Sequence, residues 1–215
     1  MNEVAETDER EILTRGAADL GLALAPHQLT RMLAYLDLIE KWNRVHNLTA
    51  IRVRTQMMTH HLLDSLAIVP HLSGMRIIDV GTGAGLPGIP VAIACPARHI
   101  TLIDSNQKKT AFLRQALTEL PIGNAAVVNE RAEAHRPVTT FDLVVSRAFA
   151  ELRTFVEQAR HLAVGGGRFV AMKGRHPAQE IEALPADIRV LNVIELKVPH
   201  LDAERHLILM DILPT

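Results

Sequence analysis

The spacing of hydrophobic positions divides the chain near Met75. Before that residue, apolar side chains recur every three or four positions, in one stripe of Leu29, Met32, Leu33, Leu36 and Ile39 and in another of Met58, Leu62, Leu66 and Val69. This spacing predicts amphipathic helices. Residues 1–10 are acidic, and we expect them to form a frayed end. The sequence thus predicts a helical extension over 1–74.

Short apolar runs alternate with helical patterns from Met75 onward. The runs predict strands at 76–80, 100–104, 125–129, 142–146, 168–172, 189–198 and 206–213. Helical patterns at about 108–120 and 151–164 lie between them, and none separates the last two runs, which predicts an antiparallel edge. Alternation of this kind is typical of a mostly parallel sheet covered on both faces. We therefore predict an α/β domain over 75–215 with seven strands.

Composition favours an ordinary folded enzyme. The chain has 215 residues, is 48% hydrophobic and carries a formal net charge of -1. No apolar run approaches the roughly 20 residues that span a bilayer, and no signal peptide pattern opens the chain. A single cysteine, Cys95, fits a reducing compartment. We therefore expect a cytoplasmic protein, not bound to a membrane, and a monomer.

A glycine-rich turn follows the first predicted strand. Residues 78–90 read Ile-Asp-Val-Gly-Thr-Gly-Ala-Gly-Leu-Pro-Gly-Ile-Pro. The glycines at 83, 85 and 88 match the dinucleotide fingerprint, but Asp79 at the strand end would repel a diphosphate. The same carboxylate would attract the ammonium group of S-adenosylmethionine. The turn therefore favours a methyl donor, and an NAD oxidoreductase stays the alternative.

The ends of the other predicted strands also carry polar groups. Asp104 follows the second strand and is placed to accept hydrogen bonds from ribose hydroxyls. Glu133, after the third strand, is a candidate for the adenine edge or a solvated loop residue. Residues 146–149 end the fourth strand without the Asn/Asp-Pro-Pro-aromatic turn of enzymes that methylate exocyclic amino groups. This pattern favours an acceptor that already carries a free lone pair, such as a ring nitrogen.

Several separate segments resemble one known family. They are 79–90, 102–114 (Leu-Ile-Asp-Ser-Asn-Gln-Lys-Lys-Thr-Ala-Phe-Leu-Arg), 141–150 (Phe-Asp-Leu-Val-Val-Ser-Arg-Ala-Phe-Ala), Arg-His-Leu at 205–207 and Asn-Leu-Thr-Ala-Ile at 47–51. Together they are similar to the glucose-inhibited division protein B family, the small-subunit ribosomal RNA guanine-N7 methyltransferases. The resemblance covers roughly residues 35 to 212.

The resemblance implies a Rossmann-like class I fold that uses S-adenosylmethionine. It also implies methyl transfer to N7 of a guanine in the 530 loop of 16S rRNA, with the rRNA or the small ribosomal subunit as partner. It places donor contacts at Gly81, Leu86, Ala132, Glu133 and Arg147. The residue argument adds Asp79, Gly83, Gly85 and Asp104. Because guanine N7 already holds a lone pair, we expect no catalytic acid or base.

RNA contacts are expected from local charge, since the net charge is near zero. The candidates are Ser146, Arg147, Phe149, Lys173, Arg175 and Arg205. The basic residues lie near strand ends and are placed to meet phosphates, while Phe149 either stacks on the guanine or packs in the core. A small-molecule methyltransferase and a non-catalytic nucleotide-binding RNA scaffold stay open as alternatives.

A metal site is not expected. His60, His61 and His71 occur without the spacing of zinc ligands or a second thiolate. We instead expect His60 and Asp64, one helical turn apart, to share a hydrogen bond.

Overall fold

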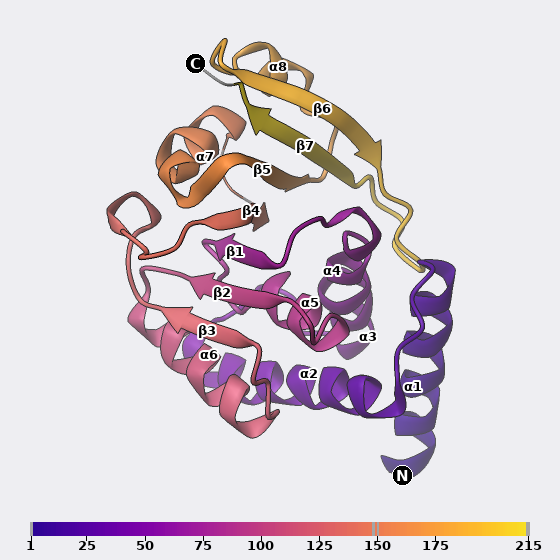
Figure 1. The fold of residues 1–215 in the computed structure, drawn as a ribbon. Coiled ribbons are helices and arrows are strands. Elements are labelled where there is room, and N and C mark those ends of the chain that lie inside the picture. Colours follow the sequence, from indigo (N-terminus) through magenta and orange to yellow (C-terminus); the bar gives the residue numbers. More distant parts are fainter. Residues whose placement is uncertain (1, 148, 150, 214–215) are drawn as a thin grey trace.

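Helices precede the sheet in the computed structural model, which describes residues 2–147, 149 and 151–213 (Figure 1). They are α1 (Asn2–Asp19), α2 (Pro26–His46), α3 (Arg54–Met57), the π-helix η1 (Met58–Leu63), α4 (Asp64–Leu66) and the 3₁₀ turn η2 (Val69–His71). Helix α1 begins at Asn2, within the 1–10 stretch for which a frayed end was expected, and residue 1 lies outside the described residues. Glu9 in this helix makes an ion pair with Arg54 at 3.0 Å, which ties α1 to α3.

Seven strands form one sheet, as predicted. They are β1 (Arg76–Val80), β2 (His99–Ile103), β3 (Ala125–Val128), β4 (Phe141–Arg147), β5 (Ala163–Lys173), β6 (Ile188–Glu195) and β7 (His206–Ile212). The order is β3-β2-β1-β4-β5-β7-β6. Strands β1 to β5 are parallel to one another, whereas β7 runs antiparallel between β5 and β6. The predicted antiparallel pair is confirmed, and its second strand lies inside the sheet.

Between the strands lie α5 (Gly88–Ala94), α6 (Gln107–Glu119), the 3₁₀ turn η3 (Ala132–Ala134), α7 (Leu152–Ala159) and α8 (Ala178–Glu182). Of the two helices predicted between strands, the one at 108–120 is confirmed as α6, whereas the other ends early. The helix predicted to run to 164 ends at Ala159, and a 3₁₀ turn, η4 (Arg160–Leu162), leads directly into β5. Ala163 pairs with Phe141 of β4, so sheet pairing overrides the local helical pattern here.

Two hydrophobic clusters fill the two faces of the sheet. On one face, buried residues of α1, α2, η1, α4, α5 and α6 pack against Ile77, Leu102 and Val145. On the other, α7 packs against Ile78, Val144 and Phe169. Hydrogen bonds also join the helical extension to the sheet domain: Tyr35 Oη donates to the Ala84 carbonyl at 2.5 Å, beneath the glycine turn. The helical extension therefore shares a core with the sheet.

None of the helices in the described part of the chain is long and apolar enough to cross a membrane.

Candidate functional site

The glycine turn after β1 is tied to the end of β2. The N–H groups of Gly81 and Thr82 both donate to the Ile103 carbonyl, at 2.9 and 3.2 Å. Gly81 and Gly85 adopt φ values of 66° and 91°, which glycine tolerates and other residues resist. A Cβ on Gly85 would lie 2.6 Å from Ile89 Cδ1, whereas a Cβ on Gly81 would meet no atom within 4 Å. The turn is therefore closely packed on one side and open on the other.

Asp79 lies beneath this turn instead of facing a ligand. Its side chain is 1% exposed, and Oδ2 accepts hydrogen bonds from Thr82 Oγ1 at 2.6 Å and from the Gly88 N–H at 2.9 Å. Alternation along the strand turns Asp79 to the same face as Ile77, toward α5. The predicted pairing of Asp79 with a donor ammonium group is thus corrected: the carboxylate braces the turn.

Burial raises the pKa of Asp79 to about 6, although the hydrogen bonds from Thr82 and Gly88 oppose that shift. The folded state therefore binds this proton more tightly than the unfolded state, and the associated stability is lost as pH rises from about 4 to about 6. We expect the stability of wild type relative to Asp79→Asn to fall over that range, by on the order of 3 kcal/mol. Chemical denaturation of both proteins from about pH 4 to 7 checks this, and parallel stability curves would contradict it.

A cavity of about 330 Å³ opens where the turn meets the ends of β2 and β3; we call it the turn cavity. It brings together four predicted donor contacts, Gly81, Asp104, Ala132 and Glu133, and also Phe149 from the predicted RNA contacts. It is further lined by residues that the sequence argument did not single out, among them Ser105, Lys109, Glu130, Arg131 and Gln158. Gly83, Gly85 and Leu86 shape the turn without lining the cavity.

Asp104 is the best-fixed polar group of the turn cavity. Oδ2 accepts a hydrogen bond from the Gly83 N–H at 3.0 Å, and Oδ1 accepts one from the Asn106 N–H at 2.8 Å. Each carboxylate oxygen retains a second acceptor site, and the pair suits a diol. Carboxylates outnumber cations in the lining, with Asp104, Glu130 and Glu133 against Lys109 and Arg131. This charge balance suits a cationic nucleoside better than a diphosphate.

A second cavity, of about 460 Å³, lies between the helical extension and the ends of β4, β5 and β7; we call it the arginine cavity. Arg147, Lys173 and Arg205, three predicted RNA contacts, line it together with Thr49, Ala50, Ile51, His60, His61, Asp64, Met172 and Gly174. Arg147 was also a predicted donor contact, but the structure places it in this cavity and not in the turn cavity.

The remaining predicted RNA contacts separate in the structure. Ser146 is 1% exposed and donates its hydroxyl to the Val80 carbonyl at 2.8 Å, so its predicted RNA contact is corrected to a role inside the sheet. Arg175 is an exposed residue after β5. Lys173 Nζ makes an ion pair with Glu180 at 2.7 Å and donates to the Phe149 carbonyl at 3.2 Å. Its ammonium group therefore holds the chain after β4, and only 12% of the side chain is exposed.

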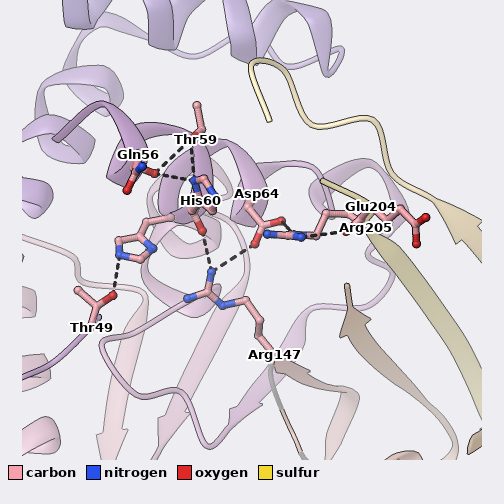
Figure 2. Close-up of polar contacts among 9 residues, drawn as sticks. Thr49, Gln56, Thr59, His60, Asp64, Arg147, Glu204 and Arg205 are labelled. Atoms are coloured by element: carbon pink, nitrogen blue, oxygen red, sulfur yellow. Dashed lines mark hydrogen bonds and ion pairs between the residues drawn. The ribbon is translucent and has the colours of Figure 1, made fainter. Parts of the chain in front are cut away.

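Figure 2 shows how the arginine cavity is held together. Arg147 Nη1 donates to the His60 carbonyl at 2.9 Å and lies 3.3 Å from Asp64 Oδ2. Arg205 Nε donates to Asp64 Oδ1 at 2.8 Å. The predicted hydrogen bond between His60 and Asp64 is wrong: His60 Nδ1 contacts the Gln56 carbonyl and Thr59 Oγ1, while Asp64 turns to the arginines.

His61, which is neutral, also lines the arginine cavity. Its Nε2 lies 3.1 Å from Thr49 Oγ1, in the 47–51 segment that carried part of the family resemblance. Burial, and next the nearby Arg147 charge, lower the pKa of His61 to about 4, so the ring is neutral at physiological pH. The sequence did not predict the contacts of Asp64 with the two arginines, because a single acid in a helical pattern suggests a surface charge. In the sequence, only the 47–51 segment indicated that part of the helical extension lies near the arginine cavity.

Arg147 and Phe149 link the end of β4 to different cavities. Arg147, the last residue of β4, lines the arginine cavity, and Phe149, two positions on, lines the turn cavity. The Phe149 ring also contacts Phe155 of α7, with 5.4 Å between ring centroids. Both cavities therefore reach the end of β4, at the edge of the sheet where ligands bind in open α/β folds.

Comparisons with known proteins agree with this geometry. A family model described as rRNA small subunit methyltransferase G matches residues 28–208. The ribosomal RNA small subunit methyltransferase G of Laribacter hongkongensis is 52% identical over 199 residues, covering 93% of this chain and 96% of that protein. The protein of the same name from Neisseria meningitidis serogroup A is 49% identical over 204 residues, covering 94% and 98%.

Solved structures show the same fold at low sequence identity. A SAM-dependent methyltransferase from Aquifex aeolicus superposes with a TM-score of 0.59 at 16% identity, covering 78% of this chain and 97% of that one. A predicted O-methyltransferase from Agrobacterium tumefaciens gives 0.55 at 23% identity, covering 70% and 79%. The sheet order seen here is therefore that of a class I methyltransferase fold.

Proposed function

The chain belongs to the rRNA small subunit methyltransferase G family, and from this premise we propose that it transfers a methyl group from S-adenosylmethionine to RNA of the small ribosomal subunit. The observation that carries the proposal is the pair of cavities that both reach the end of β4, one suited to a cationic nucleoside and the other lined by arginines. Following the sequence resemblance, we assign the methyl acceptor as N7 of a guanine in the 530 loop of 16S rRNA. We further propose a cytoplasmic monomer.

We assign S-adenosylmethionine to the turn cavity because of the charge of its lining and the open side of the glycine turn. Asp104 would accept hydrogen bonds from the ribose hydroxyls, and Ala132 and Glu133 would meet the adenine edge. Gly81 leaves open space where any other residue would place a Cβ. When bound, the donor supplies a methyl group made electrophilic by its sulfonium. NAD fits less well, because the carboxylates of the lining would face its diphosphate.

The arginine cavity supports an RNA acceptor over a small apolar molecule. Arginine side chains donate hydrogen bonds to phosphates and to the O6 edge of guanine. Arg147 and Arg205 are fixed at the cavity, and exposed Arg175 follows β5 nearby. We assign these three residues to the RNA, and Phe149 to packing beside the donor. A small apolar acceptor would offer no oxygen acceptors to the two fixed guanidinium groups.

No side chain needs to remove a proton in this reaction, because neutral guanine carries none on N7. The residues of the site instead align the two reactants and exclude water, and alignment alone can supply roughly 7 to 11 kcal/mol of the barrier. We therefore expect the single-turnover rate at saturating donor to stay nearly constant from about pH 6.5 to 9. Rapid-quench measurements across that range check this. A rate that rises tenfold per pH unit would reveal a general base and contradict the proposal.

Transfer of labelled methyl groups tests the proposed function. Small ribosomal subunits from cells that lack the modification should take up close to one methyl group each, whereas large subunits should take up none. A protein that binds the same RNA without transferring label would be the non-catalytic scaffold. Label transferred to small metabolites alone would identify a small-molecule methyltransferase.

A further inference from the structure

Asp64 lies between two guanidinium groups that come from distant parts of the chain. It belongs to the helical segment before the sheet, whereas Arg147 ends β4 and Arg205 directly precedes β7. Its side chain is 4% exposed, and its two oxygens are divided between the arginines: Oδ2 lies 3.3 Å from Arg147 Nη1 and Oδ1 lies 2.8 Å from Arg205 Nε. Figure 2 shows this carboxylate bridging the pair.

Backbone carbonyls complete the arrangement. Arg147 Nη1 also donates to the His60 carbonyl of the π-helix η1 at 2.9 Å, and Arg205 Nη1 donates to the Glu204 carbonyl at 2.8 Å. Within the described part of the chain, no protein acceptor takes a hydrogen bond from Nε or Nη2 of Arg147 or from Nη2 of Arg205. Both side chains are about one-fifth exposed and line the arginine cavity. Each arginine is thus anchored on one side and has donors available on the other.

The charges explain why the carboxylate matters for this geometry. Two guanidinium groups that share one cavity repel each other, and the negative charge between them offsets that repulsion. A long arginine side chain has many rotamers, and a charged hydrogen bond with a buried partner selects one of them. Asp64 is itself buried, on a helical segment that Leu62, Leu63 and Leu66 anchor in the core. The helical extension therefore sets where both guanidinium groups lie.

We propose that Asp64 is a positioning residue for the RNA substrate. It fixes Arg147 and Arg205 so that their remaining N–H groups form one preset array of donors for acceptor oxygens of the target nucleotide. The inference rests on the proposed function, and it gives the N-terminal helical segment a role in substrate recognition. We assign Asp64 itself no substrate contact, because its side chain is 4% exposed and its oxygens point to the two arginines.

A double-mutant cycle tests this role with small subunits that lack the modification. We expect Asp64→Asn to lower kcat/KM for the RNA by about 10- to 100-fold, the loss typical of reactants displaced by a fraction of an ångström to 1 Å. In the Arg205→Met background the same substitution should cost several-fold less, because one of its two targets is gone. The affinity for S-adenosylhomocysteine, measured by calorimetry, should stay within about threefold, since Asp64 does not line the turn cavity.

Two further variants keep the test decisive. Asp64→Glu retains the charge and should fold, and we expect its kcat/KM to lie between wild type and Asp64→Asn. Glu9→Gln removes a carboxylate that also pairs with an arginine of the helical extension, Arg54, but that lies outside the arginine cavity. This control should keep the wild-type kcat/KM.

The outcomes separate the two proposals. Equal losses from Asp64→Asn in both backgrounds, or a parallel loss of donor affinity, would reduce Asp64 to a structural residue and overturn the inference. An active Asp64→Asn enzyme with unchanged kcat/KM would overturn it as well, while the proposed function stands. Wild-type protein that transfers no methyl group to any ribosomal RNA would overturn the proposed function, and the inference with it.

Discussion

Gly81→Ala is expected to weaken binding of S-adenosylhomocysteine by about 100-fold. Two effects combine at this residue. Its φ of 66° is costly for any residue with a Cβ, and the added methyl group would enter the open space of the turn cavity. The Gly81 N–H also ties the turn to β2, so a shift of the turn would propagate to Asp104, which holds the Gly83 N–H. Calorimetric titration with S-adenosylhomocysteine measures the loss.

Gly21→Ala is the matched control for this experiment. Gly21 has a φ of 74°, and a Cβ there would also meet no atom within 4 Å, but the residue follows α1 and does not line the turn cavity. Both variants should therefore pay a similar backbone cost, seen as a similar drop in Tm. Only Gly81→Ala should lose donor affinity. Equal donor affinity in the two variants would remove the turn cavity from the account.

Arg147→Met is expected to lower methyl transfer to the small subunit by about 100-fold, with donor affinity changed by less than about threefold. The substitution keeps much of the apolar stem but removes the cation that lines the arginine cavity at the end of β4. It also leaves Asp64 with Arg205 as its remaining ion-pair partner. Single-turnover kinetics and calorimetry on one preparation separate the two quantities.

This experiment decides between two assignments of Arg147. The sequence resemblance implies a donor contact, whereas the structure places the side chain in the arginine cavity. A large loss of donor affinity in Arg147→Met would restore the donor contact and contradict the RNA assignment. Arg153→Met is a suitable control, because Arg153 pairs with Glu157 on the exposed side of α7. Its methyl transfer rate and its donor affinity should both stay at the wild-type level.

Most of the fold could be predicted because the central strands of the sheet are largely buried. Short apolar runs marked all seven strands, and β1 was predicted to the residue. The errors occur where tertiary contacts override local pattern. The sequence pattern predicted that residues 163 and 164 end a helix. In the structure Ala163 pairs with Phe141 of β4, and both residues belong to β5. The acidic residues of the first helix predicted a frayed end, but in the structure Glu9 forms an ion pair with Arg54 of α3.

The sequence predicted the part of the site that lies at the ends of the parallel strands. Asp104 and the glycines of the turn follow from spacing, because parallel strands end at the same edge. The spacing did not predict the orientation of Asp79. The turn folds back over the end of β1, and Thr82 and Gly88 donate hydrogen bonds to the carboxylate. Asp64 was missed because its partners lie 83 and 141 residues away along the chain.

Mapping the methylated atom tests the central claim most directly. Small subunits that lack the modification are incubated with the protein and labelled S-adenosylmethionine, and their 16S rRNA is then digested and analysed by mass spectrometry, with chemical cleavage at N7-methylguanine to locate the site. The proposed function predicts one N7-methylguanine, within the 530 loop, and the two-cavity site predicts that this methylation is lost in Gly81→Ala and Arg147→Met. Label on another base, on another atom of guanine, or on no RNA at all would contradict it.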